Sequence, residues 1–147
     1  MIVLDANILT RAVLGQRVLQ ALESYQSSEV GFCAPVVAFA DAERYLPALL
    51  RKKGETLPDL PATLSYLQTL VDPIGLDLYS NFEAEARQRL RKRDEEDWPV
   101  LALALSLSCP IWTEDKDFFG TGVPVWTSDR IEIFLKNAAQ SRNAEDL

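Results

Sequence analysis

The sequence contains no histidine, and only two of its 147 residues are cysteine. Without histidine, the chain lacks the Ser-His-Asp triad, the histidine acid–base pair and the zinc site with imidazole ligands. Cys33 and Cys109 each lie in an apolar segment, so we expect two buried thiols and neither a disulfide framework nor a thiolate metal site. Hydrolytic chemistry in this chain must therefore depend on carboxylates, a metal ion or both.

Long apolar runs are also missing, and positive charge is scarce. No apolar run approaches the roughly 20 residues that span a bilayer, and Asp5 interrupts the apolar start of the chain. We therefore expect a soluble, cytoplasmic protein with no membrane association. The 22 acidic and 15 basic residues give a formal net charge of −7. This charge argues against a passive nucleic-acid coat, but not against a nuclease whose acids are neutralised by divalent cations.

The length and the 48% hydrophobic composition suit one compact α/β domain. Short apolar segments predict strands at residues 1–5, 30–35, 109–115 and 123–129, and a further turn or strand near 71–76. Longer segments predict helices at residues 18–25, 36–53, 60–70, 81–93, about 98–107 and about 129–138. This alternation predicts a central, mostly parallel sheet covered on both faces. The domain is expected to span residues 1–138, followed by a polar, flexible tail at 139–147.

Two acidic residues follow predicted strands. Asp5 ends the first strand, and Asp115 comes shortly after the segment PIWT. Functional sites in open parallel sheets form outside the carboxyl ends of the strands, so these two carboxylates are candidates for a shared site. The alternative is that each acid only begins a turn or caps the segment that follows it.

Glu43 lies beside an apolar stripe on the helix predicted at residues 36–53. The stripe consists of Phe39, Ala42, Leu46, Leu49 and Leu50. We expect Glu43 at the edge of this stripe, with Asp41 and Arg44 pointing away. A carboxylate beside a buried face needs a charged or hydrogen-bonding partner, which is either a metal site or a salt bridge to an arginine.

The segment RDEEDWPVLALAL places four acids before a strongly apolar helix. Proline is tolerated only in the first turn of a helix, so Pro99 predicts a start near Asp97 or Trp98. Asp94, Glu95 and Glu96 are then expected in a solvated loop. Asp97 is either an N-cap or the fourth carboxylate of the site.

Asp5, Glu43, Asp97 and Asp115 are distant in sequence, yet a parallel sheet would bring them to one edge. Carboxylates gathered in this way do not all ionise unless a positive charge opposes them. Mg²⁺ and Mn²⁺ are the hard cations that suit oxygen ligands, and they activate water for attack on a phosphodiester. The four acids therefore predict a metal-dependent hydrolase.

The order of VLDAN, ADAERYL, DWPVLALAL and TEDKDFF resembles the PIN-domain nucleases, in particular the VapC-type toxins of bacterial toxin–antitoxin pairs. The resemblance implies a single three-layer α/β/α domain, a homodimer, and endoribonuclease activity that depends on Mg²⁺ or Mn²⁺. It also implies an RNA substrate and an antitoxin protein that blocks the site. The expected reaction is in-line attack of activated water on an RNA phosphodiester, leaving a 5′-phosphate and a 3′-hydroxyl.

Carried over residue by residue, the resemblance assigns catalytic and metal-binding roles to several positions. Asp5, Glu43, Asp97 and Asp115 correspond to the metal-binding acids, and Asp117 is similar to a further acid near the site. Asn7 and Thr113 match polar positions that support the acids by hydrogen bonding. Ala6 departs from the pattern, because many relatives carry Ser or Thr there, and this removes one supporting hydroxyl.

The source of RNA affinity and the reaction class both have alternatives. Arg87, Arg91 and Arg93 are candidates for contacts to RNA phosphates, although helix surfaces commonly carry such charges without a ligand. An acid-rich, metal-dependent phosphatase would also collect aspartates at strand ends. It usually needs a second aspartate at the position of Asn7. The other alternative is a PIN-like module that has lost activity and only binds a partner.

Overall fold

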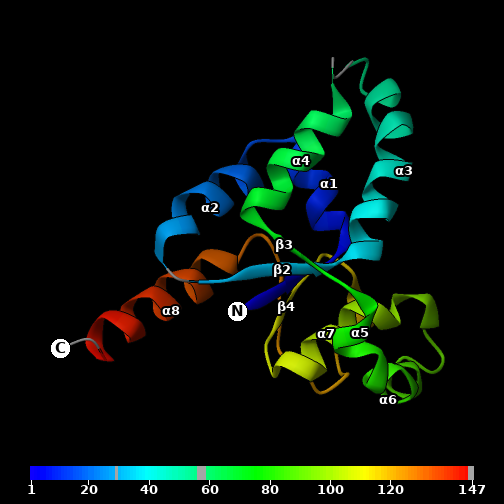
Figure 1. Cartoon of the computed structure of the whole chain (residues 1–147), viewed down its shortest axis with the longest axis vertical. Helices are drawn as coiled ribbons and strands as arrows, with labels where there is room; N and C mark the ends of the chain where they lie inside the picture. Colours follow the sequence, from blue (N-terminus) through cyan, green and yellow to red (C-terminus); the bar gives the residue numbers. More distant parts are fainter. Residues whose placement is uncertain (29, 56–58, 146–147) are drawn as a thin grey trace.

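The computed structural model describes residues 1–28, 30–55 and 59–145, and they form a parallel sheet covered by helices (Figure 1). The strands are β1 (Ile2–Leu4), β2 (Phe32–Pro35), β3 (Asp72–Ile74), β4 (Ile111–Trp112) and β5 (Val125–Trp126). Their order is β3-β2-β1-β4-β5, and all four neighbouring pairs are parallel. The first strand lies at the centre, so its carboxyl end is enclosed on both sides.

Alternation along the strands divides the interior into two cores. On β1, Ile2 and Leu4 belong to one core and Val3 to the other. On β2, Phe32 and Cys33 are divided in the same way. Successive side chains of a strand point to opposite faces, so a sheet with both faces buried requires apolar residues throughout. The three-layer α/β/α architecture predicted from the sequence is confirmed.

One face of the sheet is covered by the helices that contribute to the first core. These are α1 (Ala6–Leu14), α2 (Arg17–Tyr25), α3 (Val36–Lys52), α4 (Leu60–Leu70) and α8 (Ile131–Glu145). The opposite face is covered by α5 (Leu76–Tyr79), α6 (Glu83–Arg89) and α7 (Trp98–Leu107). Figure 1 shows α1, α3 and α4 above the sheet and α5 to α7 below it. Short 3₁₀ turns complete the fold at η1 (Gln26–Ser28), η2 (Ser80–Phe82), η3 (Glu95–Asp97) and η4 (Lys116–Phe118).

The helix boundaries match the sequence pattern in most places. The helix α7 begins at Trp98 with Pro99 in its first turn, as predicted. The helix α6 ends at Arg89 rather than Arg93, and Lys92 adopts a left-handed conformation with a φ of 72°. The sequence pattern predicted no helix at residues 6–14, where α1 begins directly after β1 and Asp5.

The C-terminal helix is longer than its hydrophobic pattern suggested. We expected it to end near residue 138, whereas α8 continues to Glu145. The additional turns lack apolar residues at regular spacing, so a prediction based on burial stops too early. Residues 146 and 147 of the expected tail lie outside the described residues.

Both cysteines are buried free thiols, as expected. Burial raises the pKa of Cys33 to about 12, so this thiol does not act as a nucleophile near neutral pH. Within the described residues, no helix is both long and apolar enough to cross a bilayer.

Candidate metal centre

Asp5 lies at the carboxyl end of β1 and caps the helix α1. Its Oδ1 accepts a hydrogen bond of 2.7 Å from the backbone N–H of Ala6, and its Oδ2 accepts one of 2.8 Å from the hydroxyl of Thr113. Burial raises the pKa of Asp5, while these two hydrogen bonds oppose the increase. The carboxylate is therefore both buried and held in one orientation.

Thr113 and Asn7 connect Asp5 to the loop that follows β4. The fully buried Thr113 hydroxyl also accepts a hydrogen bond of 2.9 Å from the backbone N–H of Asp115. Asn7 donates to Asp5 Oδ2 at 3.3 Å and to Thr113 at 3.4 Å. Its own amide oxygen accepts from the backbone N–H of Glu114 at 3.4 Å. The ends of the neighbouring strands β1 and β4 are thus joined by side-chain hydrogen bonds.

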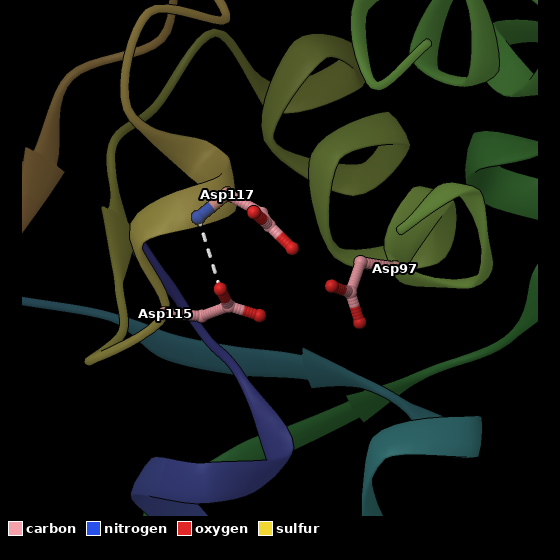
Figure 2. Close-up of side chains that lie close together, drawn as sticks. All are labelled: Asp97, Asp115 and Asp117. Carbon is pink, nitrogen blue, oxygen red and sulfur yellow. Dashed lines mark hydrogen bonds between the residues drawn. The ribbon is translucent and has the colours of Figure 1, made fainter. Parts of the chain in front are cut away.

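Asp115 and Asp117 lie at the start of the 3₁₀ turn η4. Asp115 caps this turn, because its Oδ1 accepts a hydrogen bond of 2.9 Å from the backbone N–H of Asp117. The bond is drawn in Figure 2, which shows the free oxygen of Asp115 on the side facing the other acids. The tight turn therefore places two carboxylates close together from positions only two residues apart.

Asp97 approaches these acids from the opposite side of the site, at the junction of η3 and α7 (Figure 2). Burial, the negative charge of Asp5 and the proximity of Asp115 raise the pKa of Asp97 to about 8. Its Oδ2 is buried and has no hydrogen-bond partner among the described residues. A buried carboxylate oxygen without a partner is costly unless a cation meets it.

The carboxylates of Asp97, Asp115 and Asp117 converge closely enough to share one ion. One oxygen from each lies within 4.8 Å of the others. Oxygen ligands at this spacing suit a hard divalent cation, and the partnerless oxygen of Asp97 supplies an independent reason for one. The residues present therefore fit a divalent metal ion.

The comparisons with known proteins agree with this fold. A family model described as a PIN domain matches residues 3–136. The chain belongs to the PIN-domain family. No curated protein matches the sequence significantly. Among solved structures, this PIN domain is similar to a chain described as a toxin–antitoxin complex from Klebsiella pneumoniae. The two share 19% sequence identity with a TM-score of 0.62, over 87% of this chain and 98% of the other.

The acids of α3 are placed differently from the sequence expectation. Glu43 was expected beside the buried face and Asp41 away from it, but Glu43 is exposed and Asp41 is partly buried. Asp41 is also close enough to Asp5 to raise its pKa. The apolar stripe identifies the face of α3 that packs on the core, whereas the acids of this PIN domain gather beside the sheet edge. Of the two acids, Asp41 is therefore the less exposed one.

The three arginines considered for RNA binding have different surroundings in this PIN domain. Arg87 pairs with Glu83 at 3.1 Å and lies over the Trp98 ring, with 5.4 Å from its Cζ to the ring centroid. Arg93 donates to backbone carbonyl groups, while the side chain of Arg91 is exposed. Two of the three guanidinium groups are thus already engaged within the fold.

Proposed function

We propose that this PIN domain is a metal-dependent endoribonuclease and the toxin of a type II toxin–antitoxin pair. The observation that carries the proposal is the buried, partnerless Oδ2 of Asp97 beside the carboxylates of Asp115 and Asp117. Membership of a nuclease family makes a phosphodiester the preferred substrate. Nothing in this site requires histidine, which the chain lacks.

Asp97, Asp115 and Asp117 would hold Mg²⁺ or Mn²⁺, with Asp5 contributing negative charge next to them. When bound, the cation supplies Lewis-acid activation of water and neutralises charge on the scissile phosphate. The protein contributes rigidity, since the orientation of Asp5 is set by hydrogen bonds from Ala6, Asn7 and Thr113. Ligands held in place before the reaction need little reorganisation during it.

Asp41 is the carboxylate of α3 that we assign to this site, in place of Glu43. Its partial burial and its effect on the pKa of Asp5 support a position beside the other acids. Arg44 pairs with it at 3.1 Å and holds its side chain. Asp41 would then be an acid of the site contributed by α3, in addition to those contributed by β1, η3 and η4.

RNA affinity must come from local cations, because the chain as a whole is acidic. Arg11, Arg17 and Lys53 line a cavity of about 410 Å³ where α1, α2 and α3 meet. We assign this basic cavity and the exposed Arg91 to contacts with RNA phosphates. Arg87 and Arg93 are less suited to that role, because partners within the protein already occupy them.

An antitoxin partner, a homodimer and a cytoplasmic location complete the proposal. The structural neighbour is described as a toxin–antitoxin complex, which supports an antitoxin as the protein that binds this chain. A phosphatase is less consistent with the site, because Asn7 stands where a second catalytic aspartate would be needed. Its amide hydrogen-bonds to Asp5 and Thr113 instead.

The decisive experiment incubates the purified protein with structured RNA in Mg²⁺, in Mn²⁺ and in EDTA. Asp97→Asn is compared with Glu96→Gln, a matched control that neutralises the exposed neighbouring acid. We expect metal-dependent cleavage by the wild type and by Glu96→Gln, and a loss of at least 100-fold in Asp97→Asn, comparable to removing a dominant electrostatic contribution to catalysis.

Three outcomes would contradict the proposal. Cleavage that persists in EDTA would exclude the metal centre. Release of phosphate from a small phosphoester with intact RNA would favour the phosphatase. If the purified protein cleaves neither substrate but retains a bound partner protein, it would be an inactive binding module.

A further inference from the structure

Two arginines near the end of α6 reach across to the loop of residues 117–122. Arg93 donates through Nη1 to the backbone carbonyl of Asp117 at 2.6 Å and also to that of Phe119. Arg89 donates to the carbonyl of Thr121 at 2.7 Å, while its other nitrogen pairs with Glu85 at 2.6 Å. Three carbonyl groups of one short loop are thus bound by guanidinium groups from a different segment.

The loop follows a path that leaves space for these guanidinium groups. Gly120 and Gly122 have φ values of 83° and 90°, which side chains other than glycine rarely adopt. A Cβ atom at Gly122 would lie 2.7 Å from Nη1 of Arg89, and one at Gly120 would lie 3.3 Å from Nη2 of Arg93. The loop and the two arginines are therefore shaped to fit each other.

This contact lies between the two segments that supply the acids. Asp97 precedes α7, whereas Asp115 and Asp117 follow β4, and Arg93 is four residues before Asp97. The bonds from Arg93 therefore connect the approach to Asp97 directly to the backbone of Asp117. A guanidinium group suits this task, because each terminal nitrogen carries two N–H donors, and Nη1 of Arg93 serves both carbonyl groups.

We infer that Arg93 is a positioning residue, which holds the Asp117 carboxylate at metal-sharing distance from Asp97, with Arg89 securing the far end of the same loop. The inference rests on the proposed metal centre and gives Arg93 a role different from RNA binding. Neighbours that orient metal ligands commonly contribute 10- to 100-fold to metal affinity. Loss of Arg93 should weaken metal binding while contacts to RNA remain.

The test compares Arg93→Ala with Arg91→Ala, which removes the same charge from an exposed neighbouring side chain. Titration calorimetry with Mn²⁺ should show a Kd at least about tenfold higher for Arg93→Ala and unchanged for Arg91→Ala. Hydrogen exchange of the metal-free protein should become faster at residues 115–122 in Arg93→Ala only. At saturating Mn²⁺, the KM of Arg93→Ala for RNA should equal that of the wild type.

Arg93→Lys keeps the charge and a nitrogen with several N–H donors, but on a shorter side chain of different shape, so we expect an intermediate Kd for Mn²⁺. This variant also provides the comparison if Arg93→Ala does not fold. Wild-type Mn²⁺ affinity and wild-type exchange in both Arg93 variants would overturn the inference, as would a raised KM for RNA with unchanged Mn²⁺ affinity.

The same experiments distinguish a failure of the proposed function from a failure of the role assigned to Arg93. A wild type that binds Mn²⁺ but leaves RNA intact would overturn the endoribonuclease, while the affinity and exchange measurements still support the role of Arg93. A wild type that binds no Mn²⁺ would overturn the metal centre. The exchange comparison would then decide whether Arg93 holds the loop.

Discussion

Replacing Asp97 with Asn should stabilise the metal-free protein while abolishing its response to metal. The pKa of Asp97 is raised from 3.8 to about 8 by burial, by Asp5 and by Asp115. A group whose pKa is higher in the folded state contributes stability that is complete below its unfolded pKa and disappears as the pH rises through its folded pKa. Wild-type stability should therefore fall between about pH 4 and pH 8.

The magnitude follows from the same shift in pKa. Each pKa unit corresponds to about 1.4 kcal/mol of free energy of unfolding. Without solvent screening, the ionised Asp97 would therefore lower the free energy of unfolding at pH 7 by about 4 kcal/mol. The residue is only partly buried, so screening reduces the cost to about 1–2 kcal/mol. Asn has nearly the same shape and no charge. In a protein of this size, the variant should unfold about 2–8 °C higher.

Thermal unfolding in EDTA from pH 4 to pH 9 measures this effect. The Tm of Asp97→Asn should equal that of the wild type at pH 4 and exceed it most near pH 8. The Tm of Glu96→Gln should equal that of the wild type throughout. Added Mn²⁺ should raise the Tm of the wild type and of Glu96→Gln, but not that of Asp97→Asn. An Asp97→Asn protein that is less stable than wild type at pH 8 in EDTA would refute the reasoning, as would an advantage independent of pH.

Three further predictions concern other parts of the site. Asp41→Asn should weaken Mn²⁺ binding severalfold in calorimetry, while Glu43→Gln should leave it unchanged. The reverse result would assign Glu43 to the site instead of Asp41. Thr113→Val should lower the free energy of unfolding by about 1–3 kcal/mol, because a buried acceptor and a backbone N–H lose their partner, and Thr113→Ser should recover most of it in urea unfolding. Filter binding of RNA to Arg17→Ala at several salt concentrations should give a shallower slope of log affinity against log salt, by the equivalent of about one phosphate contact. An unchanged slope would show that the basic cavity does not contact RNA phosphates.

Local patterns in the sequence determined the fold class and part of the site. Apolar segments alternating between strand and helix lengths are sufficient to predict a parallel sheet covered on both faces. Pro99 placed the start of α7 and thereby distinguished Asp97 from its three acidic neighbours. The positions of Asp5 and Asp115 after strands predicted a common edge, since the carboxyl ends of parallel strands meet there.

Only the tertiary structure decided which acid of α3 is partly buried and which arginines are engaged. Asp41 and Glu43 are two residues apart on one helix, so they point to nearly opposite sides, and hydrophobic periodicity identifies the core-facing side alone. The sequence around Arg93 suggests only a charged surface residue. In the structure, its side chain binds carbonyl groups of residues 24 and 26 positions away. Carbonyl groups are present in every residue and leave no mark in the sequence. The role of such an arginine is therefore set by how the chain is folded around it.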